Sequence, residues 1–260
     1  MKSVSIVLVV ALILLVDCTK SAEGIFGWAS SKSMDKGKQL VEAATTGDAT
    51  AVMNLLKENV EPDAYLMEDG SSALLLASES GQTDVVYMLL DSGAKVDYQR
   101  KDGATALITA SANGHLDAVK LLLDQKANLD IGDENGTSPL MFASAHGDFR
   151  VVELLLDAGA NADHQNKEGK TALMWASFFG NTDVVRLLLD RNATPQLEDV
   201  DGFNFINIME QDADGVWSVN AEQQEAAAQL LDYFELLRKE MVPIANGVPA
   251  ESNNADRSEL

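Results

Sequence analysis

The chain has 260 residues, a formal net charge of −22 and a single cysteine. So acidic a chain repels nucleic-acid phosphates and anionic membrane surfaces, so we expect no nucleic-acid partner and a contact surface on the partner that is basic or apolar. One cysteine supports neither a disulfide framework nor a zinc site built from several thiolates.

The N-terminal segment is typical of a secretory signal peptide. Lys2 precedes an apolar run over 6–16, and the small residues Ser21 and Ala22 follow it. Eleven apolar residues are too few to span a bilayer, whereas a basic start, a short apolar run and small residues are what a signal peptide requires. We therefore predict a cleaved signal peptide over 1–21, which removes Cys18, and a linker over 22–35; a retained membrane anchor is the alternative.

Glycine recurs every 33 residues through the middle of the chain. A fixed period of this length is typical of proteins built from stacked repeats. A second glycine and a leucine keep the same register. The recurring residues are Gly70, Gly103, Gly136, Gly169 and Gly202; Gly81, Gly114, Gly147 and Gly180; and Leu90, Leu123, Leu156 and Leu189. The predicted units are a divergent first repeat over 36–69, followed by 70–102, 103–135, 136–168 and 169–201.

Each unit contains two short helical patterns. In the unit that begins at Gly103, the apolar spacing predicts helices over about 105–113 and 116–124, with Gly114 ending the first. Helices this short are marginally stable alone in water, so they must stack to bury residues such as Leu107 and Leu122. The pattern therefore predicts a one-dimensional solenoid of helical hairpins joined by exposed turns.

The residues of one unit resemble a known family pattern. They are Gly136, Thr137, Pro139, Leu140, Ala143, Gly147, Val151, Val152, Leu155, Leu156, Gly159 and Ala160. This order is similar to the ankyrin repeat: glycine, Thr-Pro-Leu-His, two alanines, Gly-His, a valine and leucine run, then Gly-Ala. The resemblance covers about 36–201. It departs at the first histidine (Leu75, Ile108, Met141 and Met174 here) and at the second alanine (Ser78, Ser111, Ser144 and Ser177).

The resemblance implies an all-α, monomeric ankyrin-repeat solenoid of helix-turn-helix units with hairpin-like turn loops. It also implies a non-enzymatic protein-interaction module that needs no cofactor and binds a protein partner in a concave groove. The groove positions lie on the first helix of each unit, and they become aromatic toward the C-terminal end. The predicted partner-binding residues are Phe142, His146, Trp175, Phe178 and Phe179. The alternative is that a following segment with Phe203, Phe205 and Trp217 covers these aromatic side chains.

The segment after the repeats is predicted to be a divergent repeat or cap over 202–241, with a helix over about 222–241, and a flexible tail over 242–260. The acidic residues Glu210, Asp212 and Asp214 resemble the first half of a calcium-binding EF-hand loop, but Ala221 replaces the bidentate glutamate. The alternative function is therefore a calcium-responsive or enzyme-associated luminal factor that uses the 210–222 loop.

Other motifs bear on compartment and chemistry. The C-terminal Arg-Ser-Glu-Leu over 257–260 resembles the Lys-Asp-Glu-Leu retention signal, which predicts either the lumen of the endoplasmic reticulum or secretion. Asn135 and Asn192 each begin an Asn-x-Thr glycosylation acceptor. We find no phosphate-binding loop, no nucleophile elbow and no paired metal-binding cysteines in the sequence, so no catalytic or metal-binding residue is predicted.

Overall fold

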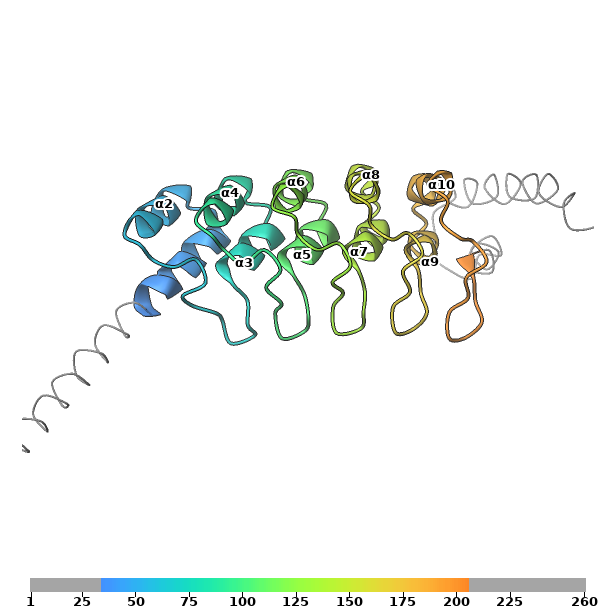
Figure 1. Ribbon diagram of the computed structural model, residues 1–260, viewed down its shortest axis with the longest axis horizontal. Helices are drawn as coiled ribbons and strands as arrows, with labels where there is room; N and C mark the ends of the chain where they lie inside the picture. Colours follow the sequence, from blue (N-terminus) through green and yellow to red (C-terminus); the bar gives the residue numbers. More distant parts are fainter. Residues whose placement is uncertain (1–33, 206–260) are drawn as a thin grey trace, which may run out of the picture.

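The computed structural model describes residues 34–205, which form a row of paired helices (Figure 1). A helix over 34–46 comes first. The following helices are α2 (Ala49–Lys57), α3 (Ala73–Glu79), α4 (Thr83–Asp91), α5 (Ala106–Ala112), α6 (Leu116–Asp124), α7 (Pro139–His146), α8 (Phe149–Asp157), α9 (Ala172–Phe178) and α10 (Thr182–Asp190). No residue between 34 and 205 lies in a β-strand. The predicted all-helical repeat solenoid is confirmed.

The helices are arranged in two rows (Figure 1). One row contains the second helix of each pair, α2, α4, α6, α8 and α10. The other contains the first helices, and α3, α5, α7 and α9 pack on one another in sequence order. The turn loops project together from the side of the first-helix row. Each repeat therefore contacts only its neighbours, as expected for a one-dimensional stack.

Local sequence explains where the first helices begin and end. The side-chain oxygens of Ser72, Thr105, Ser138 and Thr171 cap α3, α5, α7 and α9 by accepting a backbone N–H three residues later. Such a cap satisfies a donor that has no partner inside the helix. After each helix the chain reverses through a glycine with positive φ, which is +70° at Gly114. The predicted helices over 105–113 and 116–124 are thus observed as α5 and α6.

The core is a continuous layer of leucines between the two rows. In the four units over 70–201, one leucine from the first helix and one from the second helix are fully buried. They are Leu74, Leu107, Leu140 and Leu173, and Leu89, Leu122, Leu155 and Leu188. The residues that replace the family histidine are buried as well. The serines that replace the second alanine are also buried; Ser144 and Ser177 donate to Leu140 and Leu173 carbonyls, whereas the Ser78 and Ser111 hydroxyls have no partner in the described range.

The turn loops form a hydrogen-bonded ladder. The backbone N–H of Lys101 donates to the Asp69 carbonyl at 3.1 Å, and that of Glu134 donates to the Asp102 carbonyl at 2.7 Å. The same bond joins Lys167 to Asn135 and Val200 to Glu168. The loops therefore pair through their backbones from one repeat to the next, which accounts for their regular orientation despite their exposure.

Several predicted segments lie wholly or mostly outside the described residues. These are the signal peptide over 1–21, most of the linker over 22–35, most of the 202–241 cap, and the 242–260 tail. Residues 34 and 35, placed in the linker by the sequence, are helical. None of the helices between residues 34 and 205 has the length and apolar composition that a membrane span needs.

Candidate partner-binding face

One recurring set of three positions lies on each first helix, away from its buried leucine. We call these positions together the first-helix face. They are Leu76, Glu79 and Ser80; Thr109, Ala112 and Asn113; Phe142, Ala145 and His146; and Trp175, Phe178 and Phe179. Every one is exposed or half-buried except Thr109. The predicted outward orientation therefore holds for all but one residue.

Thr109 is the exception, with only 6% of its surface exposed. Its hydroxyl donates to the Ala106 carbonyl at 3.1 Å and approaches the Leu75 carbonyl of the preceding repeat at 3.5 Å. Thr109 shares the register of the groove positions predicted on the first helices, but its short side chain turns back onto the backbone between α3 and α5.

The C-terminal end of this face is an aromatic cluster on α9 and its cap residue. The rings of Trp175 and Phe179 stack with centroids 5.9 Å apart, and Phe178 meets Phe179 edge to face at 5.2 Å. Phe178 is 44% exposed and Phe179 is 45% exposed. The cluster therefore presents a preformed apolar surface, since aromatic pairs in these geometries hold each other in place.

Trp175 has a different environment from the two phenylalanines. It is half-buried and packs against the core cluster. Its Nε1 atom is buried and has no hydrogen-bond partner among the described residues. Phe178 and Phe179 are therefore the most accessible part of the cluster. Trp175 contacts both Phe179 and the core.

The other two predicted binding residues occupy the equivalent positions of α7. Phe142 is half-buried and His146 is exposed. Phe142 makes no ring contact with any described residue. The structure thus joins Trp175, Phe178 and Phe179 into one cluster, and leaves Phe142 and His146 as a separate neighbouring part of the first-helix face.

Acidic residues on the turn loops are engaged to different degrees. One Asp133 carboxylate oxygen accepts the backbone N–H groups of Asn135 and Thr137 at 2.9 and 2.8 Å, so this group stabilises its own turn. Glu168 pairs with Lys170 at 2.9 Å. The Glu134 side chain is exposed and forms no ion pair in the described range. Of these three carboxylates, Glu134 is the one most available to attract a basic partner.

A charged cluster around Arg100 was not predicted from the sequence. Its guanidinium donates to both Asp102 carboxylate oxygens, at 2.9 and 2.7 Å, and lies 3.7 Å from Glu79. The hydrogen bond from Arg100 is the main reason why the pKa of Asp102 is lowered, and the same bond raises the pKa of Arg100. The Ser71 backbone N–H and hydroxyl lower the pKa of Asp69. One feature of the sequence could have pointed to this cluster. Arg100 occupies the same position in its repeat as Asp133 and Asn166 occupy in the next two repeats.

Two of the histidines have structural contacts. A ring nitrogen of His115 lies 3.0 Å from the Glu79 carbonyl, and one of His164 lies 2.9 Å from the Gly136 carbonyl. The first contact joins adjacent repeats, whereas the second lies within the unit 136–168. His115 follows Gly114 and so occupies the place of the histidine in the Gly-His pair of the ankyrin pattern.

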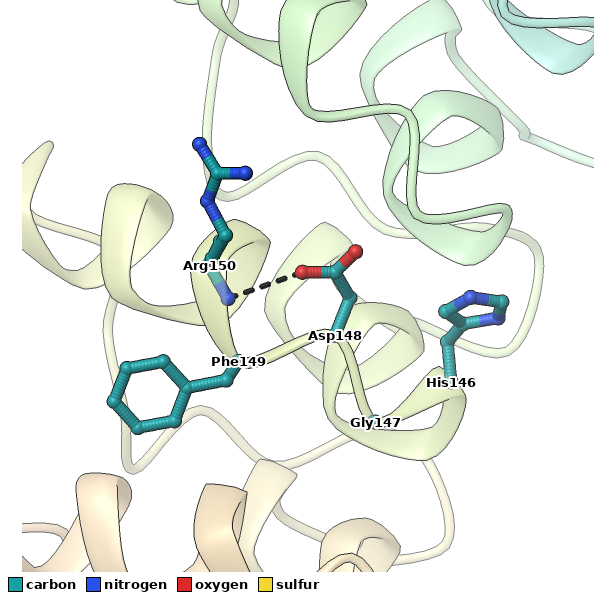
Figure 2. A pocket seen from close by; sticks show the side chains of 5 residues that line it. All are labelled: His146, Gly147, Asp148, Phe149 and Arg150. Atoms are coloured by element: carbon teal, nitrogen blue, oxygen red, sulfur yellow. Dashed lines mark hydrogen bonds between the residues drawn. The ribbon is translucent and has the colours of Figure 1, made fainter.

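The third histidine borders an open hollow at the corner between α7 and α8 (Figure 2). Its lining residues are His146, Gly147, Asp148, Phe149 and Arg150. The Asp148 carboxylate caps α8 by accepting the backbone N–H groups of Arg150 and Val151 at 3.0 and 3.1 Å. The acidic side chain of this hollow therefore serves as a helix cap.

Metal binding has no candidate in the described range. No group of three or more histidine, cysteine or acidic side chains between residues 34 and 205 is placed to hold an ion. The 210–222 loop, on which the calcium alternative depends, lies outside the described residues.

Comparison with protein-family models identifies a match. A family model described as ankyrin repeats (3 copies) matches residues 40–133 and 125–199, which together are more than half of the chain. No curated protein matches the chain.

Proposed function

Since the chain belongs to the ankyrin-repeat family, we propose that it is a non-enzymatic protein-binding module whose partner docks in the groove along the first-helix face, at its aromatic end. Ankyrin repeats are generally protein-interaction modules. The observation that supports this location is the exposure of Phe178 and Phe179 beside Trp175. Contiguous exposed aromatic surface marks interaction sites, and aromatic residues supply much of the binding energy of interfaces.

The partner's chemistry follows from the surroundings of the cluster. The rings offer an apolar surface, and the chain as a whole carries a net charge of −22. Glu134, on the turn loop that precedes α7, is exposed and forms no ion pair within residues 34–205. Opposite charge raises the rate of encounter more than it raises affinity. We therefore propose a protein partner with an apolar anchor flanked by lysine or arginine.

The competing interpretation is that the chain covers its own aromatic residues. Phe205 is 1% exposed and belongs to the core, whereas Phe203 is 40% exposed. Trp217, the third aromatic residue of that interpretation, lies outside the described range. A variant that separates binding from folding distinguishes the two interpretations, and Phe178 suits this purpose better than Trp175 because it is more exposed.

We expect Phe178→Ala to weaken partner binding at least tenfold, which corresponds to about 1.4 kcal/mol. The partner is first captured from the secretory fraction of the source cell on the immobilised full-length chain and identified by mass spectrometry. The dissociation constant is then measured with the purified partner. The matched control is Tyr87→Ala, which removes an exposed aromatic side chain from α4 in the other helix row and should leave binding unchanged.

The melting temperature of each variant must be measured alongside binding. A small change in melting temperature with a large loss of affinity supports the docking site. A sharp fall in the melting temperature of Phe178→Ala, with normal binding by the folded fraction, would instead identify the aromatic residues as shielded core.

The proposed compartment is the secretory pathway, with the chain either retained in the endoplasmic reticulum or secreted. Residues 1–21 direct entry and are cleaved, and whether residues 257–260 are read as a retention signal decides between retention and secretion. We expect N-terminal sequencing of the mature protein to begin near residue 22, and deletion of 257–260 to move the protein into the medium. An intact Met1 argues against entry, and equal secretion with and without the last four residues argues against retention.

A further inference from the structure

The tip of each turn loop contains one residue that immediately precedes the repeat glycine. In the five loops this residue is Asp69, Asp102, Asn135, Glu168 or Asp201. Four of the five are acidic, and Asn135 is the neutral exception. The side chains at this position do not all have the same structural task.

In the first two loops the tip carboxylate closes its own turn. Asp69 accepts the backbone N–H of Ser71 at 2.8 Å, and Asp102 accepts that of Ala104 at 3.0 Å. In the third loop, the turn is closed instead by a residue two positions earlier. Asp133 accepts the backbone N–H groups of Asn135 and Thr137, and its own carbonyl accepts the Gly136 N–H at 2.8 Å.

Because Asp133 closes this turn, the side chain of Asn135 takes no part in it. The residue is exposed, and its amide makes no hydrogen bond to any residue between 34 and 205. Its backbone carbonyl accepts the Lys167 N–H at 2.9 Å, so the loop ladder depends on the backbone and not on this side chain. A large substituent on the amide nitrogen would therefore break no contact of the described fold.

Asn135, Gly136 and Thr137 also form an acceptor triplet for N-linked glycosylation. We propose that Asn135 carries an N-linked glycan. In that reaction the Asn135 amide nitrogen loses a proton and bonds to the first sugar of a lipid-pyrophosphate-linked oligosaccharide. The sugar–phosphate bond breaks, and the lipid pyrophosphate leaves. The inference rests on the proposed entry into the secretory pathway, because the modification requires that compartment.

The second acceptor triplet in the chain has a different setting. Asn192 adopts a positive φ of +64° directly after α10, and Thr194 donates its hydroxyl to Asp163 at 2.6 Å. Pro195 follows that threonine, and its rigid ring restricts the conformations the acceptor can adopt. We therefore assign the glycan to Asn135 and expect Asn192 to remain unmodified.

The test is translation of the full-length chain in the presence of microsomes from the endoplasmic reticulum. The wild-type chain should gain the mass of one glycan, which an amidase specific for N-linked glycans removes. Asn135→Gln should abolish the gain, and the matched Asn192→Gln should keep it. Thr137→Ser should also keep it, because the required hydroxyl remains, whereas Thr137→Ala should lose it.

The possible results distinguish a failure of the glycosylation inference from a failure of the proposed entry into the secretory pathway. A chain that is cleaved and protected from protease but carries no glycan overturns the inference and leaves entry intact. A glycan that persists in Asn135→Gln and disappears in Asn192→Gln overturns the assignment. If the natural chain stays accessible to protease, it has not entered the microsomes, and neither the proposed entry nor natural glycosylation holds. A version of the chain with a foreign leader in place of residues 1–21 then shows whether Asn135 can accept a glycan.

Discussion

Leu122→Asp is expected to lower the free energy of unfolding by roughly 4 kcal/mol or more. Leu122 is fully buried in α6, a helix that packs against α4 and α8. An aspartate there places a carboxylate in apolar surroundings with no cation to pair with it. Because a stacked repeat is stabilised mainly by its interfaces with its neighbours, the change should weaken both interfaces of this repeat.

Urea unfolding followed by far-ultraviolet circular dichroism measures this loss. Tyr87→Asp is the control, since it introduces the same charge on α4 at a side chain that is 57% exposed. Surface changes of this kind usually alter stability by no more than about 0.5 kcal/mol. Equal unfolding midpoints for the two variants would show that Leu122 does not belong to the shared core.

The second large effect is expected for Gly103→Ala, at about 3 kcal/mol of lost stability. Gly103 has a φ of +83°, and a Cβ atom there would lie 2.7 Å from the backbone nitrogen of Glu134 and 2.8 Å from the carbonyl carbon of Asp133. Both atoms belong to the backbone of the next turn loop. The loop would have to move, which would disturb the bond from the Glu134 N–H to the Asp102 carbonyl.

Gly93→Ala isolates the backbone contribution. Gly93 has a similar φ of +87°, but a Cβ atom there meets nothing within 4 Å. Gly93→Ala should lower the free energy of unfolding by only about 1 kcal/mol, which is the cost of a left-handed conformation at an alanine. The difference between the two variants, measured by thermal or urea unfolding, reports the contact between turn loops. If both lose the same amount, the loops do not constrain one another.

Some features of the candidate site could not be predicted from the sequence, because they depend on contacts between separate helices and loops. The 33-residue period identified the three positions of the first-helix face. It did not show that the Thr109 side chain turns back onto the backbone between α3 and α5. The aromatic residues of α9 were visible in the sequence, but the division between a half-buried Trp175 and exposed phenylalanines follows from packing against the core. The pairing of Arg100 with Asp102 and Glu79 likewise joins a loop to the end of another helix.

The sequence alone determined the architecture of the repeats. Glycines at a fixed period set the places where the chain reverses, and apolar spacing set the extent of α5 and α6, because both depend on contacts within a few residues. Only the tertiary structure decided which polar side chains at the turn loops were engaged. Asp133 and Asn135 are two residues apart and both polar, yet one closes the turn and the other extends into solvent. That difference comes from the three-dimensional path of the loop, which brings the backbone N–H groups of 135 and 137 to the Asp133 carboxylate and directs the Asn135 amide outward.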